Sequence, residues 1–167
     1  MFCVNVAAMT IFGNEFTVLS SPGFRLKKND GREAWWPSLT RDAAEMSVIE
    51  ARATAERQAL PWFSRVSSLP GFLEFTSSNG SHDHHHFFQM GAIRARLGQT
   101  EAALNDLSRA VELYRHDGRP WCASYVAKAE RLMDALRTDQ AQELLRQWRV
   151  ANAKPLRIAK LLKQMEC

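Results

Sequence analysis

Two runs of apolar or small residues, spaced three and four positions apart, predict a pair of helices between residues 87 and 113. The runs are separated at residues 97–99, where Gly98 can adopt the left-handed conformation that ends a helix. We expect Thr100 to cap the second helix and Glu101 to place its charge near the positive end of the helix dipole. The pattern therefore predicts two antiparallel helices joined by a tight turn.

Alternating apolar and polar residues near the start of the chain predict β-strands instead. Asn29-Asp30-Gly31 is a strong turn signal, because Asp-Gly supplies the positive backbone angles of a tight hairpin. We expect a small antiparallel sheet of three or four strands, and one more short strand further along the chain. The expected strands are residues 2–6, 15–20, 24–28, 32–36 and 72–75.

Residues 40–59 have the composition of a helix, with Thr40 as its N-cap. An alanine-rich stripe repeats every three or four residues, so we expect this face to pack closely on the sheet. Pro61 should end the helix, because proline lacks the amide hydrogen that a helix interior needs. The stripe consists of Ala44, Val48, Ala51, Ala55 and Ala59.

The second half of the chain continues as helices. Gly118 is expected to interrupt the chain, and helices are predicted at residues 121–136 and 139–151. A last amphipathic helix is expected from Pro155, covering the apolar side of the preceding hairpin as a terminal cap does.

These elements together predict an α+β fold. Residues 1–78 would form the small antiparallel sheet with one packed helix, and residues 82–167 an all-helical half of hairpins with a C-terminal capping helix. The polar stretch at residues 76–81 is the expected boundary, and the two halves are expected to form one compact unit.

Composition agrees with a soluble globular protein. The chain has 167 residues, of which 46% are hydrophobic and 24% are charged. No apolar run approaches the roughly 20 residues that a membrane span requires. The three cysteines are odd in number and far apart, which favours a reducing compartment and a cytoplasmic location.

Positive charge is concentrated in the second half. Lys/Arg and Asp/Glu balance in residues 1–80, so the net charge of +4 lies in residues 81–167. A basic C-terminal helix suggests nucleic-acid binding as one hypothesis, although no aromatic stacking pattern accompanies the charges. The alternative is an ordinary solvated helix face.

Five consecutive residues, His82 to His86 with Asp83 among them, are the most conspicuous chemical motif. Imidazole and carboxylate groups bind zinc, nickel or copper, so His82, His84 and His86 are candidate ligands of a metal-binding protein or metal-dependent hydrolase. The alternatives are adventitious binding of a divalent metal and a solvated loop whose Asp83 caps the next helix.

Aromatic and arginine side chains suggest an interaction surface. Trp35, Trp36 and Trp62 are typical of a recognition patch, unless they fill the core, and arginines on the helical hairpin suit an acidic peptide. We name Arg94 and Arg109 as candidates, with ordinary surface charge as the alternative. A P-loop, a dinucleotide fingerprint, an HExxH motif and a nucleophile elbow are all missing, so we predict no catalytic residue and no resident cofactor.

The hairpin resembles one tetratricopeptide repeat, although Arg94 stands where that family usually has an aromatic residue. Residues 16–75 resemble a family of small bacterial domains of unknown function, through Gly-Arg-x-x-Trp-Trp-Pro at residues 31–37 and Leu-Pro-Trp-Phe at residues 60–63. That resemblance implies a bacterial cytosolic protein and no particular reaction. The positions that match the repeat are Phe87, Met90, Gly91, Gly98, Ala103, Leu107 and Ala110.

The leading functional hypothesis is a non-enzymatic module that binds a protein partner or itself. Repeat-like hairpins and the missing catalytic motifs motivate it. The metal-dependent activity at the histidines and nucleic-acid binding by the C-terminal helix are the alternatives.

Overall fold

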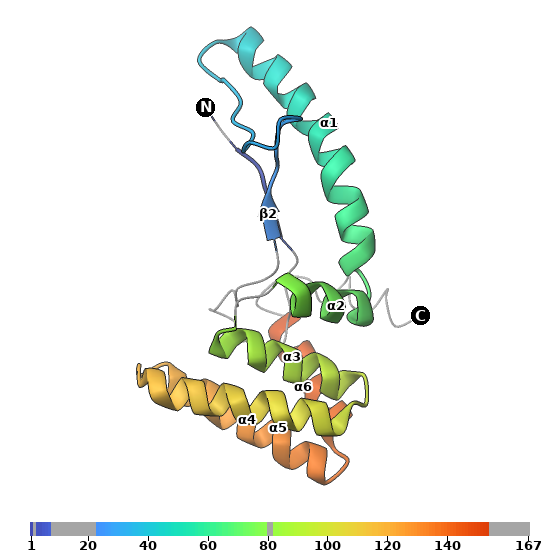
Figure 1. The fold of residues 1–167 in the computed structure, drawn as a ribbon, viewed down its shortest axis with the longest axis vertical. Coiled ribbons are helices and arrows are strands. Elements are labelled where there is room, and N and C mark those ends of the chain that lie inside the picture. The colour runs from blue at the N-terminus through green and yellow to red at the C-terminus, as the bar shows by residue number, and fades with distance from the viewer. Residues whose placement is uncertain (2, 8–22, 80–81, 154–167) are drawn as a thin grey trace. The chain divides into compact units, whose positions relative to one another are not determined.

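The structure is a computed structural model that describes all residues except 2, 8–22, 80–81 and 154–167 (Figure 1). The described residues separate into two compact units, and the boundary between them along the chain lies between Phe75 and Thr76. The elements are β1 (Asn5–Ala7), β2 (Gly23–Arg25), α1 (Arg41–Val66), α2 (Leu69–Asn79), α3 (His84–Arg96), α4 (Thr100–Asp117), α5 (Cys122–Arg137) and α6 (Ala141–Ala153).

The predicted α+β class is wrong for the described residues, which are mostly helical. They hold six helices and one pair of three-residue strands, in which β1 runs antiparallel to β2. The expected strand at residues 32–36 contributes an isolated bridge between Glu33 and Lys27. The strand expected at residues 15–20 and the capping helix expected from Pro155 lie outside the described residues.

The strand expected at residues 72–75 and residues 76–79 of the polar connector belong instead to α2. Ser68 starts this helix, because its hydroxyl accepts from the Gly71 amide at 3.1 Å and its carbonyl accepts from the Phe72 amide at 2.8 Å. A short apolar run fits a strand or a buried helix equally well, and here the cap selects the helix.

Helix α1 extends seven residues beyond the predicted end at Ala59 and contains Pro61. Thr40 is the N-cap, as predicted, and its hydroxyl accepts from the Ala43 amide at 3.2 Å. Pro61 does not end the helix, because this residue is exposed and water can serve the carbonyl that lacks an intrahelical donor.

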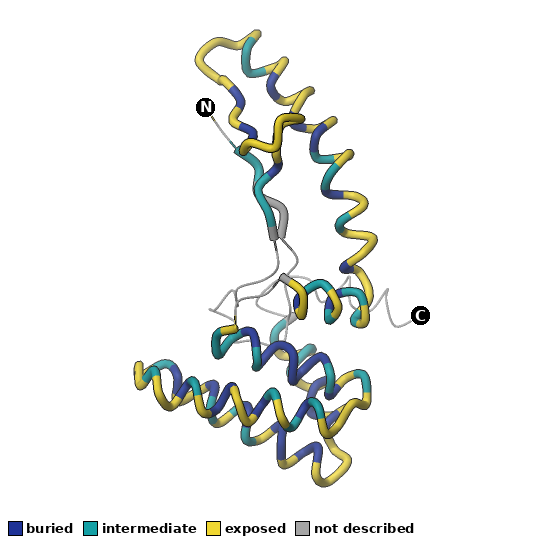
Figure 2. Tube along the Cα trace, in the orientation of Figure 1, coloured by how far each residue is buried: buried dark blue, intermediate teal, exposed yellow. Residues whose placement is uncertain are grey.

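The first unit has its core between α1 and the segment that follows β2. Leu26, Ala34 and Trp36 pack against Ala51 and Ala59, and Figure 2 shows buried residues recurring along α1 between exposed ones. Val48, part of the predicted inward stripe, is 60% exposed, and the polar Ser47 and Thr54 are buried in its place. Ser47 is accommodated because its hydroxyl donates to the Pro37 carbonyl at 2.7 Å.

Gln58 joins α1 to the same segment by two hydrogen bonds. Its side-chain oxygen accepts from the Lys27 amide at 2.9 Å, and its side-chain nitrogen donates to the Lys27 carbonyl at 2.6 Å. The amide of Gln58 thus pairs with the backbone of Lys27 as a neighbouring strand would.

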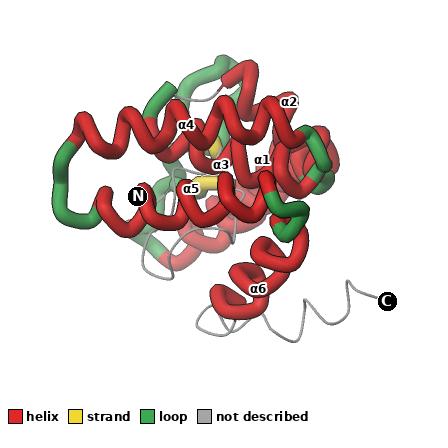
Figure 3. Tube along the Cα trace, turned by 90° about the horizontal axis from the view of Figure 1, so that it is seen from below, coloured by secondary structure: helices red, strands yellow, loops and turns green. Residues whose placement is uncertain are grey.

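All regular secondary structure in the described residues of the second unit is helical. Helices α3, α4 and α5 lie side by side, and α6 packs on α3 and α5 (Figures 1 and 3). The turn between α3 and α4 lies where the spacing predicts it, with Gly98 at a φ of +75°. Thr100 is the first helical residue of α4 rather than its cap; Gln99 holds the cap position without a side-chain hydrogen bond.

Small residues bring α3 and α4 into close contact. Gly91 of α3 lies so near α4 that a β-carbon built there would be 2.6 Å from the Leu107 side chain. Phe88, Leu107, Tyr114, Tyr125 and Leu132 are each fully buried in the surrounding core. A helical pair that packs this tightly gives the second unit a well-defined arrangement.

Candidate interaction surface

A row of large apolar side chains runs along α1 on the side away from the core. Met46 is 66% exposed, Ile49 62%, Leu60 60% and Phe63 42%. Single exposed apolar residues are common on proteins, but these four form two pairs on one face of the same helix, and an apolar patch of this kind often marks a contact site. We call this row the outward stripe of α1.

The spacing of the outward stripe explains why its members share one face. Ile49 lies three residues after Met46, and Phe63 lies three residues after Leu60. Between these two pairs, the exposed residues Ala53 and Glu56 continue the same face of the helix. Steps of three and four residues place all six within one side of a helix. Ser47, Ala51 and Thr54 lie on the opposite side and are buried, so α1 has two faces of different character.

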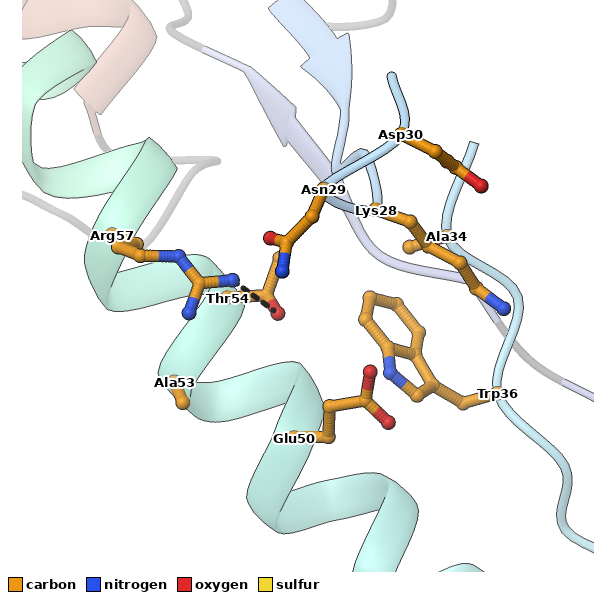
Figure 4. A pocket seen from close by; sticks show the side chains of 9 residues that line it. All are labelled: Lys28, Asn29, Asp30, Ala34, Trp36, Glu50, Ala53, Thr54 and Arg57. Carbon is orange, nitrogen blue, oxygen red and sulfur yellow. Dashed lines mark hydrogen bonds between the residues drawn. The ribbon is translucent and has the colours of Figure 1, made fainter. Parts of the chain in front are cut away.

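A recess of about 460 Å³ borders the stripe (Figure 4). Trp36 forms one side and α1 the other, and Ala53 belongs both to the recess and to the stripe. Glu50 and Arg57 stand on the α1 side, where Arg57 donates to the Thr54 hydroxyl at 3.4 Å. Lys28 and Asp30 line it from the turn, so charges of both signs surround it. The stripe therefore has a charged border.

Sequence reasoning missed the outward stripe although its signal is present. The expected end of the helix at residue 59 separated Leu60 and Phe63 from Met46 and Ile49. Once α1 is seen to continue through Pro61, the four apolar residues lie on one continuous helix.

The three predicted tryptophans lie in the first unit in different environments. Trp35 is 44% exposed and has the Arg25 guanidinium 5.5 Å from its ring centre. Trp36 is buried in the core, and Trp62 is half-buried with its ring edge-on to Phe24 at 5.5 Å. Trp35 alone of these three presents a substantial area to solvent.

The two predicted arginines lie in the second unit and form ion pairs. Arg94 of α3 contacts Asp106 of α4 at 2.8 Å, and burial raises the pKa of that carboxyl group even though Arg94 opposes the shift. Arg109 is paired with Glu112 one turn along α4 and is exposed. Arg94 thus joins two helices, whereas Arg109 contributes surface charge.

The histidines divide into two contact groups. His82 packs edge-on to His86 with ring centres 5.5 Å apart, whereas His84 lies 3.8 Å from an oxygen of Asp117. The Asp83 carboxylate accepts from the His86 amide at 2.8 Å and caps α3. Among the residues that the structure describes, no three His, Cys, Asp or Glu side chains converge as a metal site would require.

His85 belongs to an aromatic cluster between α3, α4 and the start of α5. The Nδ1 atom of His85 lies 2.8 Å from the hydroxyl of Tyr114, and its ring stacks on Trp121. Burial and the neighbouring His84 lower the pKa of His85, and burial lowers that of His86. Nearby, burial raises the pKa of Cys122, which keeps this thiol protonated and a poor nucleophile.

Comparison with known proteins assigns neither a family nor a function to the chain. No helix within the described ranges has the length and apolar character to cross a membrane. No family model, no curated protein and no solved structure matches the chain.

Proposed function

We propose that this protein is a non-enzymatic interaction module that binds another protein chain through the outward stripe of α1. The observation that carries the proposal is the exposure of Met46, Ile49, Leu60 and Phe63 along one side of a single helix. Burying an apolar side chain of this size contributes roughly 1.5–3 kcal/mol when it is fully covered. Four such residues provide a driving force for association.

The rest of the first unit holds the stripe ready for a partner. The opposite face of α1 packs on Leu26, Ala34 and Trp36, and Gln58 fixes the helix to the backbone of Lys27. A rigid helix loses little conformational freedom when it binds, so more of the apolar burial remains as affinity. Helices with anchors at such spacings typically bind a groove or another helix.

The same proposal places the protein in a bacterial cytoplasm. The bacterial assignment rests on the resemblance of residues 16–75 to a bacterial domain family. The two cysteines within the described residues, Cys3 and Cys122, are both free, as is usual in a reducing compartment.

Site-specific photocrosslinking in the native host tests the proposal. A photoreactive phenylalanine analogue at position 49 or 60 is expected to yield a covalent adduct with another protein chain, because both positions face outward on the stripe. The same analogue in place of Val48 is the control, since Val48 is 60% exposed but lies off the stripe. Adducts of equal yield at all three positions, or none at positions 49 and 60, would refute the proposed function.

A further inference from the structure

We infer that the chain on the outward stripe is a second copy of this protein, paired through α1 in antiparallel orientation. This inference rests on the proposed function and names the partner. The stripe repeats in steps of three and four, the pattern by which helices pair side by side. It extends over roughly 26 Å, at 1.5 Å per residue, from Met46 to Phe63.

Antiparallel pairing places the apolar residues opposite one another. With the symmetry axis between residues 54 and 55, each end of the stripe meets the other end in the second copy. Glu56, the one charged member of the stripe, then lies beside Ala53 of the other copy at the centre of the pair. The small alanine leaves space for water around the Glu56 carboxylate. The layers pair Met46 with Phe63, Ile49 with Leu60 and Ala53 with Glu56, each twice by symmetry.

The charges beside the stripe fit the same register. Glu50 and Arg57 follow stripe positions directly and stand on the edge next to the recess. In the antiparallel pair, Glu50 of each copy comes opposite Arg57 of the other, which gives two attractive pairs. On the other edge, Arg52 meets the small residue Ala59. Along the described length of α1, this arrangement therefore brings no like charges face to face.

Parallel pairing has the opposite electrostatics. Glu45 of one copy would meet Glu50 of the other, and Arg52 would meet Arg57. Glu56 would also meet its own copy in the centre of the stripe. Each of these contacts repels, so the pattern of charge selects the antiparallel orientation.

Sliding the antiparallel pair by one heptad is also unfavourable. Glu50 would then face Glu50, Arg52 would face Arg52, and Met46 would pack against Glu56. One register therefore combines apolar layers with attractive charges.

The size of the contact predicts a weak dimer. Two helices that meet over two to three heptads bury less area than the roughly 1,200–2,000 Å² of a stable interface. We therefore expect a dissociation constant on the order of ten micromolar, within reach of sedimentation velocity on the full-length chain between about 1 and about 500 µM.

Substitution on the stripe tests whether this face forms the dimer. Ile49→Glu and Leu60→Glu are expected to weaken dimerisation at least about tenfold, because each places one charge in both of the symmetry-related Ile49–Leu60 layers. Val48→Glu, the exposed control, should leave the dissociation constant unchanged. Far-UV circular dichroism checks that every variant keeps the helix content of the parent.

Charge reversal tests the orientation. Glu50→Arg and Arg57→Glu should each weaken the dimer about tenfold, because symmetry doubles every change, and the combined variant should restore it. In a parallel dimer either single reversal would instead tighten binding. The introduced arginine at position 50 would then meet Glu45, and the introduced glutamate at position 57 would meet Arg52.

Three results would overturn the inference: a parent chain that stays monomeric throughout the range, single reversals that tighten binding, or an equal effect of Val48→Glu. If the parent is monomeric and its stripe crosslinks to a different protein, the partner is not a second copy of this chain, and the proposed function still holds. A stripe that crosslinks to nothing would remove the proposed function itself.

Discussion

Gly91→Ala tests how closely α3 packs on α4. The added methyl group would lie 2.6 Å from Cγ of Leu107, 2.9 Å from its Cδ2 and 3.2 Å from the carbonyl oxygen of Ala103. Carbon atoms at van der Waals contact stand about 3.5–4.0 Å apart, so Leu107 would have to move. Leu107 is fully buried and surrounded by core residues, which leaves it little room to do so.

Two opposing effects determine how much Gly91→Ala changes the free energy of unfolding. Overpacking a core costs about 1–3 kcal/mol, whereas replacing glycine with alanine inside a helix stabilises it by about 0.5–1 kcal/mol. We expect a net loss of about 1–2 kcal/mol in the free energy of unfolding of the second unit. In a Leu107→Ala background the leucine atoms nearest the new methyl group are absent. The same Gly91→Ala change should then stabilise the second unit by about 0.5–1 kcal/mol.

Amide hydrogen exchange in α4, measured by mass spectrometry on the full-length chain, isolates this unit from the other. The double-mutant cycle compares the parent, Gly91→Ala, Leu107→Ala and the combined variant. Leu107→Ala alone should cost about 2–5 kcal/mol, and the sign of the Gly91→Ala effect should reverse between the two backgrounds. An increase in α4 protection on introducing Gly91→Ala into the parent would refute the reasoning.

Three further predictions concern a cap, a titration and a helix interior. Asp83→Ala should cost about 1 kcal/mol by removing the cap of α3, seen as faster exchange in its first turn; unchanged exchange would exclude the cap. Because burial lowers the pKa of His85 and His86 in the folded state, the unfolded chain binds their protons first. The free energy of unfolding of the second unit should therefore fall as pH drops from about 7.5 through about 6.5, a loss that His85→Gln reduces in urea titrations. Pro61→Ala should stabilise α1 by up to about 3 kcal/mol, and a lower melting temperature would contradict this.

The helical hairpin was predictable because several local signals agree. Apolar spacing on both sides of Gly98 defines α3 and α4, and the glycine adopts the left-handed conformation that the turn needs. Thr40 at the start of α1 is a second such case, because its hydroxyl accepts from the Ala43 amide as an N-cap does.

The front half was harder to predict because its signals conflict. Alternation near the start of the chain predicts a sheet of three or four strands, but the described residues hold one pair of three-residue strands and a bridge between Lys27 and Glu33. The apolar run from Phe72 to Phe75 fits either class of structure, and a capping serine before it decides for helix. Proline removes one hydrogen bond from a helix, so the sequence predicts an end at Pro61, whereas α1 continues through this exposed position.

The outward stripe shows what periodicity alone leaves open. Helix α1 carries one set of small residues and one set of large apolar residues on different sides, and either set fits a core. The structure buries the side with Ser47 and Thr54 and exposes the side with Met46 and Ile49. Polar groups became buried because Ser47 has a backbone partner within reach, which sequence spacing does not reveal.

The paired hydrogen bonds between Gln58 and Lys27 set the rotational phase of α1 about its own axis. A helix that packs through alanines has few side chains to stop it from rolling, and a shift by one residue turns it through about 100°. Such a roll would carry Ile49 toward the interior. Together with the hydrogen bond from Ser47 to the Pro37 carbonyl, this glutamine therefore fixes which surface of α1 faces the solvent.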